Sequence, residues 1–297
     1  MTWDEPWQEQ VVKRADYFVL ARINSNDLYK GASLQVLKTI GGTKLPENIQ
    51  INAFYLLQMC KNTGAERPEF HLGVGDTSYF FLKKSITGFY SIATPTSGYA
   101  RVRNGNVSAT YRHSYHQALV PAIIYEPTMT AIFQKYHQQP YDTVAINAFV
   151  DKYLALAPTL LSKETAATFF MQHVALELVY HLQLPGKYEQ LLSFLHATNN
   201  FHAQNSAARA LAAYNTPEAK QELLKLLGDA SLKDFTKCLA ITTLISYNPT
   251  ELKPQLEELE KTASEAENGF GNSDRDPRSC THVPTVREAL QQLVAKL

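Results

Sequence analysis

The sequence predicts two domains of different class, a small β-barrel in residues 1–140 followed by an all-α helical repeat in residues 141–297. Two Trp, ten Tyr and seven Phe residues precede residue 141, together with apolar–polar alternation of period two. Beyond this point Ala, Leu, Glu, Lys and Gln dominate at helical spacing. Strand formers followed by helix formers predict a β domain and then an α domain.

Composition places the chain among folded globular proteins. Hydrophobic residues make up 45% of the 297 residues and charged residues 19%, which is too apolar for a disordered chain. The formal net charge is zero, but residues 1–140 hold fourteen basic and ten acidic residues, and residues 141–297 hold fourteen and eighteen. A neutral chain argues against a dedicated nucleic-acid-binding protein, which needs a basic excess.

The first half contains five to seven predicted strands. A short helix is expected within residues 3–14, and Asn104-Gly105 is typical of a type I′ turn between two strands. Short strands separated by turn residues indicate a small barrel or a sandwich. The predicted strands span residues 16–23, 34–40, 49–55, 77–82, 89–93, 99–103 and 107–111.

Three segments of this half resemble one known family. Residues 15–23 (ADYFVLARI), 37–42 (LKTIGG) and 72–76 (LGVGD, followed by a strand) are similar to the netrin-like domain, an OB-type barrel found in tissue inhibitors of metalloproteinases. The resemblance covers roughly residues 3–112 and implies an OB-type fold. That family inhibits proteases through an N-terminal Cys that chelates zinc. This chain has no Cys before Cys60 and lacks the family's disulfides, so the resemblance does not extend to inhibition.

The second half is predicted to be helical throughout. Ile146, Val150 and Leu154 share one face of the first helix, and Thr216 with Pro217 is typical of a helix start. The predicted helices span residues 143–156, 165–183, 188–195, 205–214, 217–228, 232–247, 249–266 and 284–295.

A period of 33 residues runs through these helices. His181, Tyr214 and Tyr247 follow one another at this spacing, and Pro recurs at positions 185, 217 and 249. Each unit is a helix, a Pro-marked turn and a helix, which is typical of an α-solenoid. The pattern resembles three to four HEAT-type repeats and lacks the Trp and Gly pattern of tetratricopeptide repeats. An irregular helical bundle is the alternative.

No residue pattern predicts a catalytic, cofactor or metal site. His113 and His116 have the spacing of a ligand pair, but no Cys, Asp or Glu lies near them, so strand-end or surface histidines are expected. Asp274 and Asp276 follow Asn272 as in a calcium loop, but Pro277 stands where that loop needs glycine. The sequence also lacks HExxH and Gly-x-Ser-x-Gly motifs.

The number of cysteines, the hydropathy and the N-terminus are relevant to the cellular compartment of the protein. Cys60, Cys238 and Cys280 are too few for a disulfide scaffold, and buried or inert thiols are expected. No apolar stretch reaches the roughly 20 residues of a membrane span. The polar N-terminus suggests a cytoplasmic protein as numbered, or a secreted or periplasmic one if a signal peptide was removed before Met1.

We therefore predict a non-enzymatic protein-binding or scaffold protein that uses its helical-repeat surface and its barrel. One alternative is an enzyme or small-ligand-binding protein with a site in an inter-domain cleft near His113, Tyr115 and His116. A weaker alternative is single-stranded nucleic-acid binding by the barrel, while the oligomeric state is left open. The candidate partner-binding residues are Trp3, Trp7, Lys83, Lys84, Arg101, Arg103, Asp274, Arg275, Asp276 and Arg278.

Overall fold

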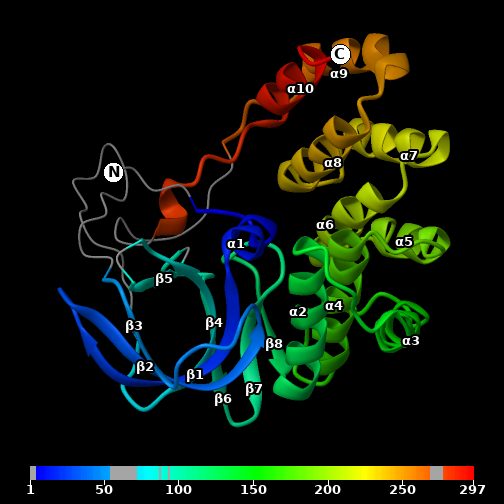
Figure 1. Ribbon diagram of the computed structural model, residues 1–297. Helices are drawn as coiled ribbons and strands as arrows, with labels where there is room; N and C mark the ends of the chain where they lie inside the picture. Colours follow the sequence, from blue (N-terminus) through cyan, green and yellow to red (C-terminus); the bar gives the residue numbers. More distant parts are fainter. Residues whose placement is uncertain (1–4, 54–71, 87, 93, 268–276) are drawn as a thin grey trace. The chain divides into compact units, whose positions relative to one another are not determined.

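The computed structural model describes residues 5–53, 72–86, 88–92, 94–267 and 277–297. The chain divides into two compact units (Figure 1). The first consists of Met1–Asp142 and Gly269–Thr281, and the second of Thr143–Asn268 and His282–Leu297. The first unit therefore contains a segment from near the C-terminus, which the single boundary at residue 140 did not anticipate.

Five strands of the first unit form a closed barrel. β1 pairs with β2 on one edge and with β4 on the other, and β5 lies between β3 and β4. The β3–β5 pairing is parallel, whereas the other pairings are antiparallel. Closure removes the free edges that an open sheet exposes. The barrel strands are β1 (Tyr17–Asp27), β2 (Gly31–Gly41), β3 (Asn48–Ile51), β4 (Thr77–Lys84) and β5 (Tyr90–Ile92).

Alternation along β1 separates two apolar layers. Val19, Ala21 and Ile23 point into the barrel, where they pack with residues such as Leu34 and Phe80. The neighbouring Phe18 points to the other side and is also fully buried. Successive side chains of a strand face opposite sides, so a strand buried on both faces must be covered outside the barrel as well.

Helices α1 (Gln8–Arg14) and α2 (Ala122–Tyr136) provide this outer cover. The ring of Phe18 stacks on Phe81 of β4 at 4.9 Å and on Phe133 of α2 at 6.2 Å. α2 approaches β2 so closely that a Cβ added at Gly41 would lie 2.5 Å from the Phe133 ring. Glycine is therefore required at the end of β2, where the outer layer meets the barrel.

Three further strands extend the sheet from β4. β6 (Tyr99–Arg103) and β7 (Asn106–Thr110) form a hairpin, and β8 (Gln117–Pro121) pairs with β7. Asn104 and Gly105 have φ angles of 49° and 74°, which confirms the predicted type I′ turn. Neither β8 nor α2 was predicted, because residues 118–136 have an apolar stretch without clear period and carry Pro127 inside the helix.

The N-terminal segment ties distant parts of the first unit together. The buried carboxylate of Glu5 accepts hydrogen bonds from the hydroxyls of Thr94 at 3.0 Å and Ser97 at 3.2 Å, and from Thr96. The backbone N–H of Glu5 donates to Thr281 Oγ1 at 3.1 Å. Glu5 thus links the β5–β6 connection to the segment that returns from near the C-terminus.

The second unit is a stack of antiparallel helix pairs. The two helices of each pair pack on each other, in the pairs α3/α4, α5/α6, α7/α8 and α9/α10. Successive pairs meet through their second helices, because α4 contacts α6, α6 contacts α8 and α8 contacts α10. Within this unit Figure 1 shows α3, α5 and α7 in one row and α4, α6 and α8 in a second. The helices are α3 (Thr143–Leu154), α4 (Ala166–Leu182), α5 (Tyr188–Leu195), α6 (Phe201–Ala210), α7 (Pro217–Gly228), α8 (Asp234–Tyr247), α9 (Lys253–Thr262) and α10 (Val286–Val294).

The two tyrosines of the 33-residue period have equivalent contacts. The Tyr214 hydroxyl donates to the carbonyl of Leu184 at 2.8 Å, and the Tyr247 hydroxyl donates to the carbonyl of Leu211. Each therefore bonds a backbone carbonyl just beyond the preceding helix of the α4–α6–α8 row. Such carbonyls at helix ends need a partner when they are buried. Both tyrosines thus bond back to the end of the preceding helix of this row, to carbonyls 30 and 36 residues earlier in the chain.

One of the two described cysteines does not have the buried or inert thiol that was expected. Cys238 on α8 is a buried cysteine that is not in a disulfide, as expected, and burial raises the pKa of its thiol to about 12. Cys280, in a short 3-10 helix (Pro277–Cys280), is disulfide-bonded, so the expectation of an inert thiol is wrong there. Sequence spacing did not show that this segment belongs to the first unit. Cys60 lies outside the described residues.

Among the helices of the described part of the chain, none is both long and apolar enough to cross a bilayer.

The repeated tyrosine contact can be tested by Tyr214→Phe and Tyr247→Phe. Each change leaves a partly or fully buried carbonyl without its donor and should lower the free energy of unfolding by about 1–2 kcal/mol. Chemical denaturation followed by circular dichroism measures the loss. Tyr153→Phe is the matched control, because its ring on α3 is half-buried and the described part of the structure shows no hydrogen bond from its hydroxyl. Equal stability of all four proteins would contradict the assigned role.

A second test concerns the thiol of Cys238. Because burial holds its pKa at about 12, the thiol stays protonated and unreactive at pH 8 in the folded protein. Mass spectrometry after brief iodoacetamide treatment should find Cys238 unmodified in buffer and fully alkylated in denaturant. Rapid alkylation in buffer would show that the α8 packing is open to solvent.

Candidate functional site

The connection between α3 and α4 exposes three leucines. Leu156, Leu160 and Leu161 are 46%, 57% and 53% exposed, although all three lie within six residues. Scattered exposed leucines are common on protein surfaces, but several together mark a candidate interaction site. We call residues 155–165 the leucine loop.

A buried amide holds the backbone of the leucine loop. Gln172 of α4, only 3% exposed, accepts a hydrogen bond from the N–H of Thr159 at 2.9 Å through its Oε1. Its Nε2 donates to the carbonyl of Ala157 at 2.8 Å. The Asn200 side chain, which caps α6, donates to the carbonyl of Thr159 at 3.0 Å. Two different helices therefore fix the loop between its leucines.

Hydroxyl groups fix the far end of the leucine loop. The N–H of Ser162 donates to Thr165 Oγ1 at 2.9 Å, and the Thr165 hydroxyl donates to the carbonyl of Leu160. These bonds replace the backbone partners that the loop lacks before α4 begins. The loop is thus held in one conformation that leaves its leucines in solvent.

Apolar side chains are also exposed on α3. Ile146, Val150 and Leu154 are buried against the unit, whereas Val144 is 80% exposed, Ala148 is exposed one turn further along, and Ala155 is exposed just after the helix ends. A helix at the end of a helical stack normally has a polar outer surface. We define the leucine face as Val144, Ala148, Ala155, Leu156, Leu160 and Leu161.

The other end of the stack has this expected polar surface. The exposed side chains of α9 include Glu257, Glu258 and Lys261, and those of α10 include Gln291 and Gln292. Only the end that α3 forms has an apolar surface in the described part of this unit. The asymmetry identifies the leucine face as the candidate site.

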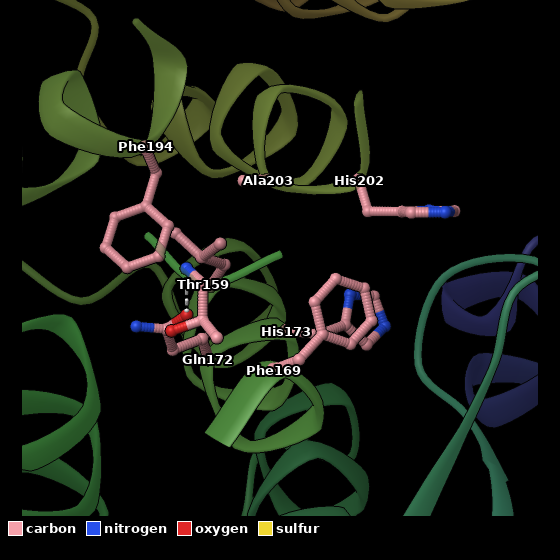
Figure 2. Close-up of a pocket in the computed structure, with 8 residues that line it drawn as sticks. Thr159, Phe169, Gln172, His173, Phe194, His202 and Ala203 are labelled. Carbon is pink, nitrogen blue, oxygen red and sulfur yellow. Dashed lines mark hydrogen bonds between the residues drawn. The ribbon is translucent and has the colours of Figure 1, made fainter. Parts of the chain in front are cut away.

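A small pocket lies next to the leucine loop (Figure 2). Its wall includes Thr159 of the loop, Phe169 and Gln172 of α4, and Phe194 of α5, and the dashed line in Figure 2 marks the bond between Thr159 and Gln172. The free volume is about 10 Å³, which is about the space that one water molecule needs. The pocket is too small for a substrate or cofactor.

A buried polar cluster joins α4 to α6. Ser206 Oγ donates to Glu177 at 3.0 Å and lies 3.0 Å from Nδ1 of His173, and Arg209 Nε lies 3.3 Å from the Glu177 carboxylate. In a nucleophilic triad the imidazole stands between the hydroxyl and the carboxylate. Here the hydroxyl stands between the other two groups, so the cluster has the order of a structural network. The Arg209 guanidinium also covers the ring of Tyr180 at 3.9 Å.

The predicted basic residues of the barrel occupy separate places. Lys83 and Lys84 end β4 opposite β5, whereas Arg101 pairs with Ser78 near the start of β4. Five residues of a strand separate these positions, which corresponds to roughly 17 Å. Arg101 also forms an ion pair with Asp76 at 3.1 Å, and Arg103 is exposed at the end of β6. The strands thus do not bring the four side chains into one cluster.

The remaining predicted residues lie at several positions of the first unit. His113 is buried, Tyr115 exposed and His116 half-buried in one turn between β7 and β8, where the N–H of Tyr115 donates to His113 Nδ1 at 3.2 Å. Trp7 is the N-cap residue of α1, and the centroid of its ring lies 5.2 Å from that of the His113 ring. Arg278 lies half-buried in the 3-10 helix. Trp3, Asp274, Arg275 and Asp276 lie outside the described residues.

Metal-ligating side chains do not converge in the described ranges. No group of three or more His, Cys, Asp or Glu side chains there is placed to hold a metal ion. His173 of α4 is buried and lies within hydrogen-bond distance of Ser206.

Comparison with known proteins does not assign the chain to a family. The chain matches no protein family, no curated protein and no solved structure. The leucine face and the helix pairs that present it are therefore the structural basis for a functional proposal.

Sequence reasoning missed the leucine face. The first helix was expected to end at residue 156 and ends at Leu154, but Leu160 and Leu161 were given no role. Two adjacent leucines in a connection between helices were the available signal. The side chains of Gln172 and Asn200 that bind the loop backbone lie 13 to 41 residues away in sequence and carry no recognisable motif.

The hydrogen bonds by which Gln172 holds the leucine loop can be tested by Gln172→Leu. The change leaves the N–H of Thr159 and the carbonyl of Ala157 without their buried partner and should cost about 1–3 kcal/mol of unfolding free energy. Hydrogen exchange of the loop amides should also become at least about tenfold faster. Gln221→Leu, at an exposed position of α7, is the matched control and should change neither quantity. Unchanged exchange in the Gln172 variant would show that the loop is held by other contacts.

Proposed function

We propose that the chain is a non-enzymatic protein-binding protein that acts as a scaffold, with the leucine face as its binding surface. The observation that carries the proposal is an apolar surface held in place by buried amides at one end of a stack of helix pairs. Water contact with several leucines is unfavourable, since full burial of one contributes about 1.5–3 kcal/mol. A polypeptide that covers the face would recover part of this free energy.

The fixed conformation of the leucine loop favours specific binding. Association is opposed by the entropy of ordering loops and side chains at the interface. Because Gln172 and Asn200 already order this loop, little further ordering is required when a partner binds. A rigid apolar centre with charged residues around it is also the usual arrangement of a protein–protein interface.

We further propose that the helical unit is a HEAT-like α-solenoid. The continuous packing of α4, α6, α8 and α10 and the equivalent contacts of Tyr214 and Tyr247 support this assignment. Solenoids present extended surfaces that commonly hold other macromolecules. The assignment therefore agrees with a scaffold role for this unit.

For the first unit we propose an OB-type barrel of the netrin-like kind. The ring order β1-β2-β3-β5-β4, closed by the β1–β4 pairing, supports a five-stranded barrel of this type. The barrel is a candidate second binding surface, in which Lys83, Lys84 and Arg103 are exposed. Fold alone does not establish function, so the leucine face carries the proposal.

The proposal predicts that the double substitution Leu160→Glu/Leu161→Glu abolishes partner capture. Tagged full-length chain would be incubated with native lysate and treated with an amine-reactive cross-linker, for which Lys152 and Lys163 lie beside the leucine face. Polypeptides linked to these two lysines should fall at least about tenfold in the variant, because two buried carboxylates cannot be accommodated in an apolar interface.

The matched control is Gln291→Glu/Gln292→Glu, which adds the same charge at the polar end of the stack. Its cross-links at Lys152 and Lys163 should equal those of the unmodified chain. Cross-links that persist in the leucine variant would show that the face is not a binding surface. Circular dichroism spectra of both variants should match, since all four positions are exposed.

A further inference from the structure

We propose that His137 is a proton-dependent link between helices α1 and α2, so that α1 is held on the first unit more firmly in mildly acidic than in mildly alkaline solution. The inference concerns the first unit alone and does not depend on the leucine face. Its basis is the set of atoms that surround the two nitrogens of the His137 ring.

The His137 ring lies between two backbone carbonyls. Its Nδ1 is 2.8 Å from the carbonyl oxygen of Phe133, one turn earlier in α2. Its Nε2 is 2.8 Å from the carbonyl oxygen of Ala15, the residue that follows α1. A carbonyl oxygen accepts hydrogen bonds and has no proton to donate. Both contacts therefore require a proton on the ring nitrogen.

Only the charged form of histidine supplies both protons. A neutral imidazole has one N–H, whereas an imidazolium has two. If the ring were neutral, a nitrogen lone pair would face a carbonyl oxygen at 2.8 Å. A half-turn of the ring about its bond to Cβ would put carbon atoms in place of both nitrogens, so that orientation offers neither carbonyl an N–H donor. Ala15 is only 2% exposed, so its carbonyl would be costly to leave without a donor.

Two further features favour a positive charge on the ring. The His137 ring stacks on the ring of Phe133 with the centroids 4.0 Å apart and an angle of 12° between the planes. A cation over an aromatic face is attracted to the electrons of that face. His137 is also the C-cap residue of α2, and the C-terminal end of a helix favours a positive charge. The surroundings of the ring thus favour the imidazolium.

Carboxylates do not hold this proton. In the described part of the chain no ion pair joins an acid to His137, and the nearby Asp16 accepts the N–H of Lys84 at 2.9 Å. Lys13, Arg14 and Lys135 are exposed, so water and salt screen their repulsion of the ring. Asp, Lys and Tyr side chains ordinarily titrate outside the range from about pH 5 to 9. The other titratable groups on the elements around the ring are Tyr17, Lys44, Lys84, Tyr136, Tyr141 and Asp142.

The direction of the pH dependence follows from the form that the folded chain prefers. Histidine in an unfolded chain releases its proton near pH 6.5, on the order of neutral pH. Because the folded chain gains both hydrogen bonds only with the protonated ring, their stabilisation is fully present below this pH and is lost as the pH rises. The contact with Ala15 joins residues 122 apart in sequence, and Val11 and Val12 of α1 are fully buried. Loss of the proton therefore loosens α1 and favours exposure of its apolar side.

Nitrogen-15 NMR of the full-length chain at pH 7 tests the protonation directly. Protonated and unprotonated ring nitrogens have different chemical shifts, and the signals of His137 are those that disappear in His137→Phe. If this variant does not fold, sequential assignment of the unmodified chain identifies the same signals. Both nitrogens of His137 should be protonated. One protonated and one unprotonated nitrogen at this pH overturns the inference.

Hydrogen exchange tests the link between the helices. The α1 amides of His137→Phe are compared with those of the unmodified chain at the same pH, so that the intrinsic pH dependence of exchange cancels. The variant keeps a ring beside Phe133 but removes both donors. At about pH 5.5 its α1 amides should exchange at least about tenfold faster, because two charge-assisted hydrogen bonds are lost. At about pH 8.5 this ratio should be at least about threefold smaller, because the unmodified ring has then lost a proton as well.

The matched control is His196→Phe, which removes an exposed histidine at the end of α5 in the second unit. Its α1 amides should exchange as in the unmodified chain at both pH values. A ratio for His137→Phe that is equal at both pH values would show that the link does not depend on a proton. A ratio near one at both would show that His137 does not hold α1. Either result overturns the inference.

Discussion

A pair of helices cannot bury all of its apolar surface by itself, and this constraint organises the helical unit. Each pair must pack against another, so α4, α6, α8 and α10 form a continuous series. The series has to end where a helix exposes a surface that water tolerates. α9 and α10 provide such an end with charged and amide side chains, whereas α3 also exposes Val144 and is followed by the exposed leucines of its loop. The leucine face follows directly from this difference.

Stacking creates a second requirement, because it removes polar backbone groups from water. Carbonyls near the ends of α4 and α6 receive the hydroxyls of Tyr214 and Tyr247, and the loop before α4 receives the amides of Gln172 and Asn200. The same requirement holds for Glu177, whose buried carboxylate is surrounded by Ser206 and Arg209. Buried polar groups without partners are costly, so these contacts fix how successive pairs align. The ordered leucine loop is one product of that alignment.

Much of the fold follows from local patterns in the sequence. The alternation around Val19 and the Asn104-Gly105 turn predicted strands where strands lie, and the period from Tyr214 to Tyr247 marked equivalent contacts. Helix α2 was missed because Pro127 and an apolar run without clear period obscured it. The candidate site was also missed, because the loop that carries Leu160 is bonded by Gln172 and Asn200, which lie far from it in sequence. Local patterns report periodicity, but they do not report which distant amide binds a loop.

The chain order has a consequence for dissecting the protein. Residues 269–281 belong to the barrel unit, yet the helical unit needs α10, which follows them in sequence. Thr281 receives the N–H of Glu5, so the barrel draws on both ends of the polypeptide. A fragment cut after residue 142 would lack part of its own unit, and the complementary fragment would carry a segment without its packing partner. Neither unit is therefore one continuous stretch of the sequence. Transfer of either unit to another protein by simple fusion would separate residues that fold together.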